Sequence, residues 1–148
     1  MKSIGFLDVA AIVGLIVFLI GVRFFQHSIF YDPLDPYFHG NFQAQPIPEM
    51  NIFKLFLSNS LRYLLNGVFS IGILWMLFKS SSYIKASLWV YLFALVLLNA
   101  VFLLMLQWEI PIAKMALFYS RRFIIHPLLL FVLVAGGFYL HNKTSKTD

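Results

Sequence analysis

Two pairs of polar residues interrupt apolar sequence, and each pair begins with an arginine. Arg62 is followed four positions later by Asn66, and Arg122 by His126. Residues four apart share one face of an α-helix and lie about 6 Å apart along its axis. Each pair therefore presents a guanidinium group with a hydrogen-bonding group one turn away. This chemistry suits an anion such as a carboxylate, a lipid phosphate or the C-terminus of a peptide.

Other charged residues are predicted to gather around these pairs. Arg23 and Arg121 fall at the same end of the apolar segments, and so do the acids Asp32, Asp35, Glu49 and Glu109. Ionisable groups at the edge of hydrocarbon are costly, so we treat the cluster as a candidate binding site. The predicted binding residues are Arg62, Asn66, Arg121, Arg122, His126 and Asp32. The alternative is that the arginines only reach lipid phosphates or pair with Asp32 and Glu109 to fix the loops.

The elements that position these residues are four apolar stretches, each long enough to cross a membrane as a helix of about 20 residues. The chain is 61% hydrophobic and 11% charged, whereas a soluble domain averages roughly 25% charged residues. The sequence predicts an all-α integral membrane bundle of four spans, forming one transmembrane domain over residues 1–148 in contact with membrane lipids. The predicted spans are residues 5–25, 61–78, 84–106 and 123–140, with an extended outer loop over 26–60.

The lysines predict the orientation of these spans. Lys2, the lysines of the 79–85 hinge, and Lys143 and Lys146 all fall on one side of a four-span bundle. Short lysine-bearing loops face the cytoplasm, so we expect both termini inside and the arginines outside. The lysines flank the spans, which explains the formal charge of +5 better than nucleic-acid binding does.

Local signals predict how the outer segments are built. Residues 51–57 form a short amphipathic run that suits a helix lying in the interface, and Ser58-Asn59-Ser60 suits the cap of the second span. Residues 112–119 predict a second interfacial helix before the fourth span. Pro127 follows His126 inside that span, so we expect a bend there and a freed backbone carbonyl at Phe123.

The residue types and their spacing give little support for catalysis. The chain has no cysteine, which removes thiolate catalysis and cysteine metal sites, and its serines lack an adjacent base. The loop residues His27, Asp32, Asp35 and His39 lack calcium-loop spacing, and His126 has no second ligand at metal spacing. We expect no catalytic residues, no metal and no cofactor, which favours a non-catalytic protein.

Three blocks of sequence resemble a known family. They are Phe30-Tyr31-Asp32-Pro33-Leu34 with Tyr37-Phe38, then Leu61-Arg62-Tyr63-Leu64-Leu65-Asn66, then Phe118-Tyr119-Ser120-Arg121-Arg122-Phe123-Ile124-Ile125-His126-Pro127. Together they resemble the exosortase F system-associated membrane proteins of Bacteroidetes, which are short polytopic proteins encoded beside an exosortase. The resemblance covers nearly the whole chain. It implies an inner-membrane protein with a partner role in protein sorting, beside an exosortase that carries the cysteine nucleophile.

We therefore expect an accessory membrane protein that binds an exosortase, or its substrate, through the outer arginine rim. Two alternatives remain. One is a lipid-phosphate or isoprenoid-handling membrane enzyme using Arg62, Arg121, Arg122 and His126, which requires a nucleophile or a metal cluster. The other is a small subunit of a transporter or respiratory complex, which requires a charged pair deep in a span.

Overall fold

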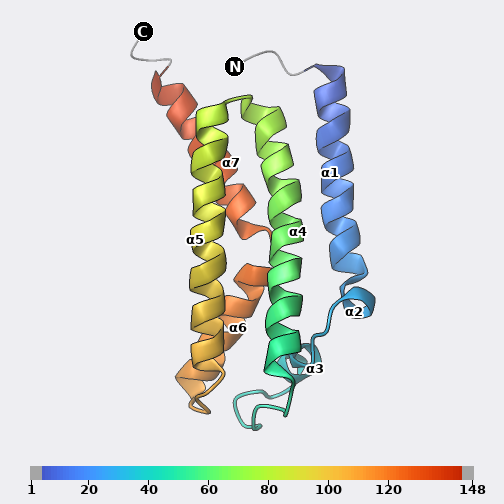
Figure 1. Ribbon diagram of the computed structural model, residues 1–148, viewed down its shortest axis with the longest axis vertical. Coiled ribbons are helices and arrows are strands. Elements are labelled where there is room, and N and C mark those ends of the chain that lie inside the picture. The colour runs from blue at the N-terminus through green and yellow to red at the C-terminus, as the bar shows by residue number, and fades with distance from the viewer. Residues whose placement is uncertain (1–4, 145–148) are drawn as a thin grey trace.

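The computed structural model describes residues 5–144, apart from the side chains of His27 and of residues 141–144, and every regular element in that range is an α-helix. The long helices are α1 (Phe6–Phe24), α4 (Ile52–Phe78), α5 (Ser81–Met105), α6 (Pro111–Ile125) and α7 (Leu128–Thr144). Two short helices, α2 (Gln26–Ile29) and α3 (Leu34–His39), lie between α1 and α4. As Figure 1 shows, α1 begins and α7 ends at the same end of the molecule as the α4–α5 turn. We call this end of the molecule the turn end. We call the opposite end the arginine end, because it holds Arg23, Arg62, Arg121 and Arg122.

The helices have the length and composition of a membrane protein. α1, α4 and α5 are each long and apolar enough to cross a bilayer. α6 and α7 pass the same test only as a pair, and the pair is bent by 65°. The all-helical prediction is therefore confirmed for the described residues. The four-span prediction holds only if the bent pair counts as one span, since otherwise there are three.

The second span begins nine residues earlier than predicted. α4 starts at Ile52, so the predicted interfacial run at 51–57 and the predicted cap at Ser58-Asn59-Ser60 both lie within one continuous helix. The cap is instead Asn51, whose side-chain oxygen accepts the backbone N–H of Lys54 at 3.0 Å. The predictions were wrong because no proline or glycine separates Asn51 from Leu61, so nothing ends the helix between them.

The predicted fourth span is not one helix. α6 ends at Ile125, His126 takes an extended conformation (ψ 140°), and α7 begins at Leu128. An extended residue before proline is expected, because the proline ring excludes the helical region for its neighbour. The sequence predicted a bend and a freed carbonyl at Phe123. In the structure the chain breaks fully, and a side chain from α4, that of Asn66, donates to the Ile125 carbonyl at 2.7 Å.

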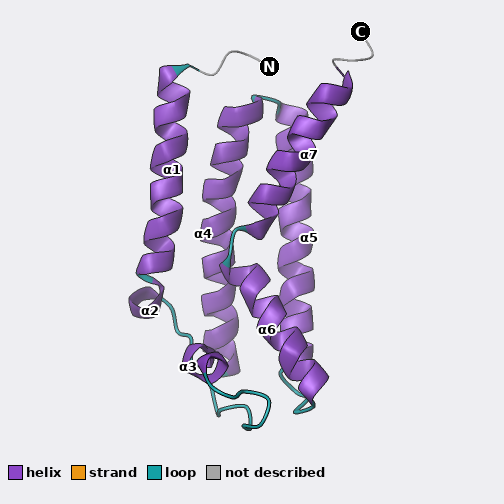
Figure 2. Ribbon diagram, turned by 180° about the vertical axis from the view of Figure 1, so that it is seen from behind, coloured by secondary structure: helices purple, strands orange, loops and turns teal. Residues whose placement is uncertain are grey.

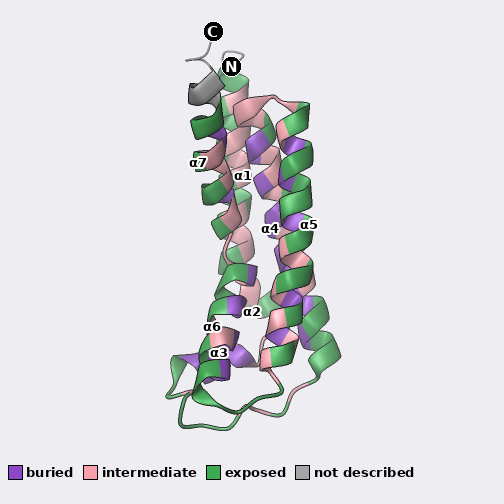
Figure 3. Ribbon diagram, turned by 90° about the vertical axis from the view of Figure 1, so that its left-hand side faces the viewer, coloured by how far each residue is buried: buried purple, intermediate pink, exposed green. Residues whose placement is uncertain are grey.

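The core lies around α4, which packs against α1, α5, α6 and α7. The larger buried cluster is at the arginine end and joins α3, α4, α5 and α6. The smaller one, at the turn end, joins α4, α5 and α7. α1 has no buried residue, as the burial colours of Figure 3 indicate. In Figure 2 it stands apart from α6 and α7. Its apolar side chains suit contact with lipid.

A matched pair of glycines in α7 tests this packing. A Cβ added at Gly137 would lie 2.4 Å from the tip of the Phe78 ring, whereas one added at Gly136 would lie 3.9 Å from the Tyr83 hydroxyl. We expect Gly137→Ala to lower the free energy of unfolding by about 1 kcal/mol, the lower end of the range for overpacking, because the Phe78 ring can shift. Gly136→Ala should change it by less than about 0.5 kcal/mol. Thermal unfolding of both variants in detergent measures the difference, and equal stabilities would contradict the packing of α7 on Phe78.

Candidate anion-binding site at the arginine end

Asp32 is the centre of a buried ion network. Its carboxylate accepts from Nη1 of Arg62 at 3.0 Å and from Nη2 of Arg121 at 2.6 Å. Arg121 also reaches Asp35, at 2.8 Å. Arg62 is only 1% exposed and Arg121 only 8%. Buried charges persist only when they are paired and hydrogen-bonded, so this network ties the α1–α4 connection to α4 and α6.

Aromatic rings enclose the same guanidinium groups. Arg62 lies over the ring of Phe30, 4.8 Å from its centroid, and Arg121 lies 5.7 Å from the centroid of Phe38. Residues 30–38 thus supply two carboxylates and two rings to the two buried arginines. We call residues 30–38 the cradle, because their ring faces and carboxylates both attract the guanidinium groups of other helices.

The local fold of residues 30–45 holds this cradle in place. Pro33 precedes α3 with the φ of −70° that suits a helix start. Burial raises the pKa of the Tyr37 phenol, and the charge of Glu109 raises it further. The hydroxyl therefore stays protonated and donates to the carbonyl of Phe42 at 2.7 Å. Lys114, which is buried, donates to the carbonyl of Gln45 at 2.6 Å and fixes the loop to α6.

A second group of cations lies beside the network, around a polar pocket of about 250 Å³. Nη1 of Arg23, from the end of α1, lies 2.9 Å from Nδ1 of His126. Arginine only donates hydrogen bonds, so a ring nitrogen of His126 accepts. Arg122 is exposed, and its guanidinium lies 5.5 Å from the Phe118 centroid. The residues around the pocket are Arg23, Gln26, Asp35, His39, Phe118, Arg121, Arg122, Ile125 and His126.

The charges at this end do not balance. Among the described residues, Asp32 and Asp35 are the carboxylates that pair with arginine: Asp32 pairs with Arg62 and Arg121, and Asp35 pairs with Arg121. Neither Arg23 nor Arg122 has a carboxylate within ion-pair distance in that part of the chain. Four guanidinium groups therefore face two carboxylates, and two positive charges remain at the polar pocket. This surplus favours an anion there.

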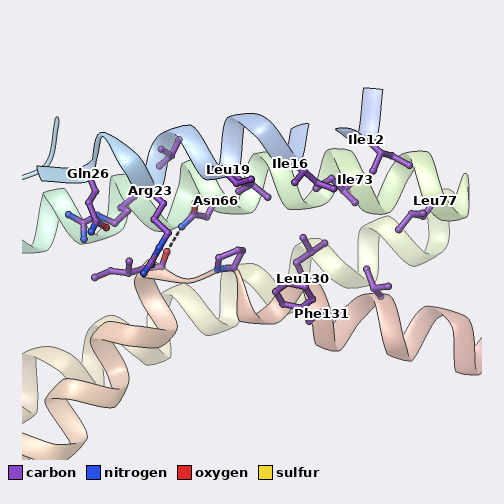
Figure 4. A pocket seen from close by; sticks show the side chains of 16 residues that line it. Ile12, Ile16, Leu19, Arg23, Gln26, Asn66, Ile73, Leu77, Leu130 and Phe131 are labelled. Atoms are coloured by element: carbon purple, nitrogen blue, oxygen red, sulfur yellow. Dashed lines mark hydrogen bonds between the residues drawn. The ribbon is translucent and has the colours of Figure 1, made fainter. Parts of the chain in front are cut away.

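An apolar cavity of about 420 Å³ adjoins the polar pocket and runs from it toward the turn end between α1, α4 and α7 (Figure 4). Arg23, Gln26 and Ile125 line both spaces. Arg62 also lines the cavity, and its Nε and Nη2 have no hydrogen-bond partner among the described residues. Two buried nitrogens of this cation therefore lack an acceptor among the described residues, and such groups are expensive to leave unsatisfied.

The structure divides the predicted binding residues into two groups. Arg62, Arg121 and Asp32 form the buried network, while Arg122 and His126 border the polar pocket. Arg122 is exposed, and its neighbour Arg121 is the arginine of α6 that turns inward to the acids.

Asn66 differs from its predicted use. Its side-chain amide donates to the Ile125 carbonyl at the chain break, so its donor is engaged in holding α6. It remains beside the apolar cavity, as Figure 4 shows. Glu109, which was predicted to lie among the arginines, is exposed and does not join the site.

Three residues of the site were left out of the predicted binding set. Arg23 was correctly predicted to lie at the arginine end, but it was not included among the binding residues. Its position, a cation at the end of an apolar helix, could have indicated it. Asp35 lies three residues after Asp32, a spacing that puts both on one side of a short turn and could have indicated shared partners. Gln26 carried no signal in the sequence.

No group of three or more histidine, aspartate or glutamate side chains is placed to hold a metal ion within the described residues. No protein-family model, curated protein or solved structure matches this chain. The site therefore has to be interpreted from its own chemistry, which is that of a positively charged pocket opening into an apolar cavity.

Proposed function

We propose that this protein is a non-catalytic accessory subunit of an exosortase-type protein-sorting system. It sits in a bacterial inner membrane with both termini in the cytoplasm and binds an anionic group of its partner or surroundings at the arginine end. The observation on which the proposal rests is that two of the four arginines are paired with acids and two are not. Asp32 holds Arg62 and Arg121, while Arg23 and Arg122 pair with no acid in the described part of the chain and border an open pocket.

The three blocks that resemble the exosortase-associated family supply most of this arrangement. Phe30 and Asp32 come from the first block, Arg62 and Asn66 from the second, and Arg121 from the third. Direct contacts join the blocks at one place: Asp32 bonds both arginines, and Asn66 bonds the Ile125 carbonyl. Three blocks that meet in space behave as one unit, which supports the proposal that the family resemblance concerns the arginine end.

Binding to the partner is the direct test. The native protein is purified with its cell's exosortase by an affinity tag, and the retained exosortase is quantified by mass spectrometry. Charge-assisted hydrogen bonds are each worth about 1.5–3 kcal/mol, so Arg23→Gln with Arg122→Gln should reduce retention by about tenfold or more. Lys54→Gln is the matched control, because it removes an exposed positive charge at the arginine end, in the first turn of α4. Retention equal to the wild type in the double arginine variant would contradict the proposed site.

The orientation is tested by cysteine labelling, which is simple because the chain has no cysteine of its own. Gln43 is exposed beyond the arginine end, and Ser82 is exposed at the turn end. In intact cells we expect an impermeant thiol reagent to label Gln43→Cys and to spare Ser82→Cys until the inner membrane is broken. The predicted cytoplasmic positions Ser3 and Ser145 lie outside the described residues, so Ser82 stands in for them. Labelling of Ser82→Cys in intact cells would reverse the topology.

A further inference from the structure

We infer that the protein binds one molecule of an anionic phospholipid. Its phosphate occupies the polar pocket at Arg23 and Arg122, and one of its hydrocarbon chains occupies the apolar cavity between α1, α4 and α7. This inference rests on the proposed function in one point, that the arginine end binds an anion. It adds the chemical class of the ligand and a second, apolar half of the site.

The two spaces form one amphipathic site. Arg23, Gln26 and Ile125 are common to both, so the polar pocket opens directly into the apolar cavity. In Figure 4 the polar side chains Arg23, Gln26 and Asn66 lie at one end, and the cavity continues between apolar side chains. The labelled apolar residues along it are Ile12, Ile16, Leu19, Ile73, Leu77, Leu130 and Phe131. A ligand that fills both spaces must be charged at one end and apolar over the rest of its length.

The charged end must be negative and rich in acceptors. Arg23 and Arg122 both line the polar pocket, and neither has a carboxylate partner within the described residues. A phosphate supplies several acceptor oxygens and matches the planar donor array of arginine. A zwitterionic head group carries its own cation, which the surplus positive charge of the pocket repels.

The dimensions of the cavity select a hydrocarbon chain. Its lining extends from Ile12 to Arg23 on α1 and from Arg62 to Leu77 on α4, which at about 1.5 Å per residue is a length of about 16 to 22 Å. A volume of about 420 Å³ spread over that length is roughly 5 Å across, which suits a single methylene chain, since carbon atoms pack about 4 Å apart. An α-helix is about 10 Å wide, so a single turn of it would fill the same volume. The space therefore suits a single hydrocarbon chain better than a transmembrane helix of a protein substrate.

The position of α1 gives the chain a route into the cavity. α1 packs mainly along α4 and makes little contact with α7, although residues of both helices line the cavity. In Figure 4 Leu130 and Phe131 of α7 lie on one side of it, and Ile12 and Ile16 of α1 lie on the other. A lipid in the surrounding bilayer can thus enter sideways between α1 and α7 without crossing the packed core around α4.

Native mass spectrometry of the purified full chain, stripped of lipid in detergent, tests the inference. Three probes are compared: phosphatidylglycerol, phosphatidylcholine with the same acyl chains, and inorganic phosphate. We expect one phosphatidylglycerol to bind at least tenfold more tightly than either other probe. Arg23→Gln with Arg122→Gln should abolish this preference, and Lys54→Gln should keep it.

The apolar half needs its own variants. Ile16→Trp places a large ring in the cavity, whereas Val17→Trp adds the same ring on a neighbouring, lipid-facing position of α1 that does not line it. Ile16→Trp should weaken phosphatidylglycerol binding about tenfold, and Val17→Trp should leave it unchanged. Unfolding temperatures of all variants identify any that fail to fold. If Ile16→Trp fails to fold, Ile16→Phe replaces it. If the double arginine variant fails to fold, a single arginine substitution replaces it.

Four results would overturn the inference. Equal binding of phosphatidylcholine would mean ordinary surrounding lipid, and equal binding of inorganic phosphate would mean an anion site without the apolar half. Displacement of the lipid by an apolar peptide with a free C-terminal carboxylate, which then binds more tightly, would make the site a peptide site. Insensitivity to both the arginine and the Ile16 substitutions would place the lipid elsewhere. Because the exosortase is absent from these measurements, a failed partner test with intact lipid binding would remove the proposed function alone.

Discussion

Replacing Asp32 by asparagine is expected to lower the free energy of unfolding by about 3–5 kcal/mol, the cost of removing one partner from a buried ion pair. The substitution keeps the size of the side chain but removes the charge that Arg62 and Arg121 share. Arg121 retains Asp35, at 2.8 Å, whereas Arg62 loses its only ion pair in the described part of the chain. Most of the loss therefore comes from Arg62, a buried cation that keeps the ring of Phe30 but loses its carboxylate partner.

A second substitution isolates that cause. If the buried Arg62 charge is what destabilises Asp32→Asn, then adding Arg62→Met should recover part of the loss, since neither charge remains. Glu109→Gln is the matched control, because it neutralises an exposed carboxylate at the same end of the molecule. Reversible unfolding in detergent or bicelles gives the free energies. A loss for Asp32→Asn no larger than for Glu109→Gln would show that the network is not stabilising.

Replacing Asn66 by leucine is expected to lower the free energy of unfolding by about 2 kcal/mol, because the Ile125 carbonyl would lose its donor in an apolar environment. In a continuous helix the N–H of Leu129 would bond this carbonyl, but His126 is extended and the helix does not continue past Ile125, so that hydrogen bond is not made. The angle between α6 and α7 should also become less well defined. Spin labels at the exposed residues Tyr119 and Tyr139 report that angle as a distance distribution, which we expect to broaden.

Gln107→Leu serves as the control for this change. It removes an amide from an exposed position just beyond α5, where the effect should stay within about 0.5 kcal/mol. An unchanged distance distribution in Asn66→Leu would mean that the bend is held by Pro127 and the surrounding packing alone. An unchanged free energy of unfolding would mean that another donor serves the Ile125 carbonyl.

Much of the helical framework followed from the sequence by itself. The predicted stretches 5–25 and 84–106 correspond to α1 (Phe6–Phe24) and α5 (Ser81–Met105) within three residues at each end. Apolar runs of this length are a local property, so they can be recognised without knowledge of their neighbours. The interruption at His126-Pro127 was also predictable, because it arises from the covalent structure of proline. The start of α4 was not, since residues 51–60 suit either a separate interfacial helix or the first turns of a longer one.

The pairing of the charges was decided only by the tertiary structure. Asp32 is 30 residues from Arg62 and 89 from Arg121, and no local pattern reports which acid meets which base over such separations. Adjacent helical residues point about 100° apart, so only one of Arg121 and Arg122 can face the cradle. The spacing of Arg122 and His126 favoured Arg122, whereas the packing of α6 against α4 and α3 turns Arg121 inward. That rotation of α6 leaves Arg122 at the polar pocket, where its charge has no acid among the described residues and is available to a ligand.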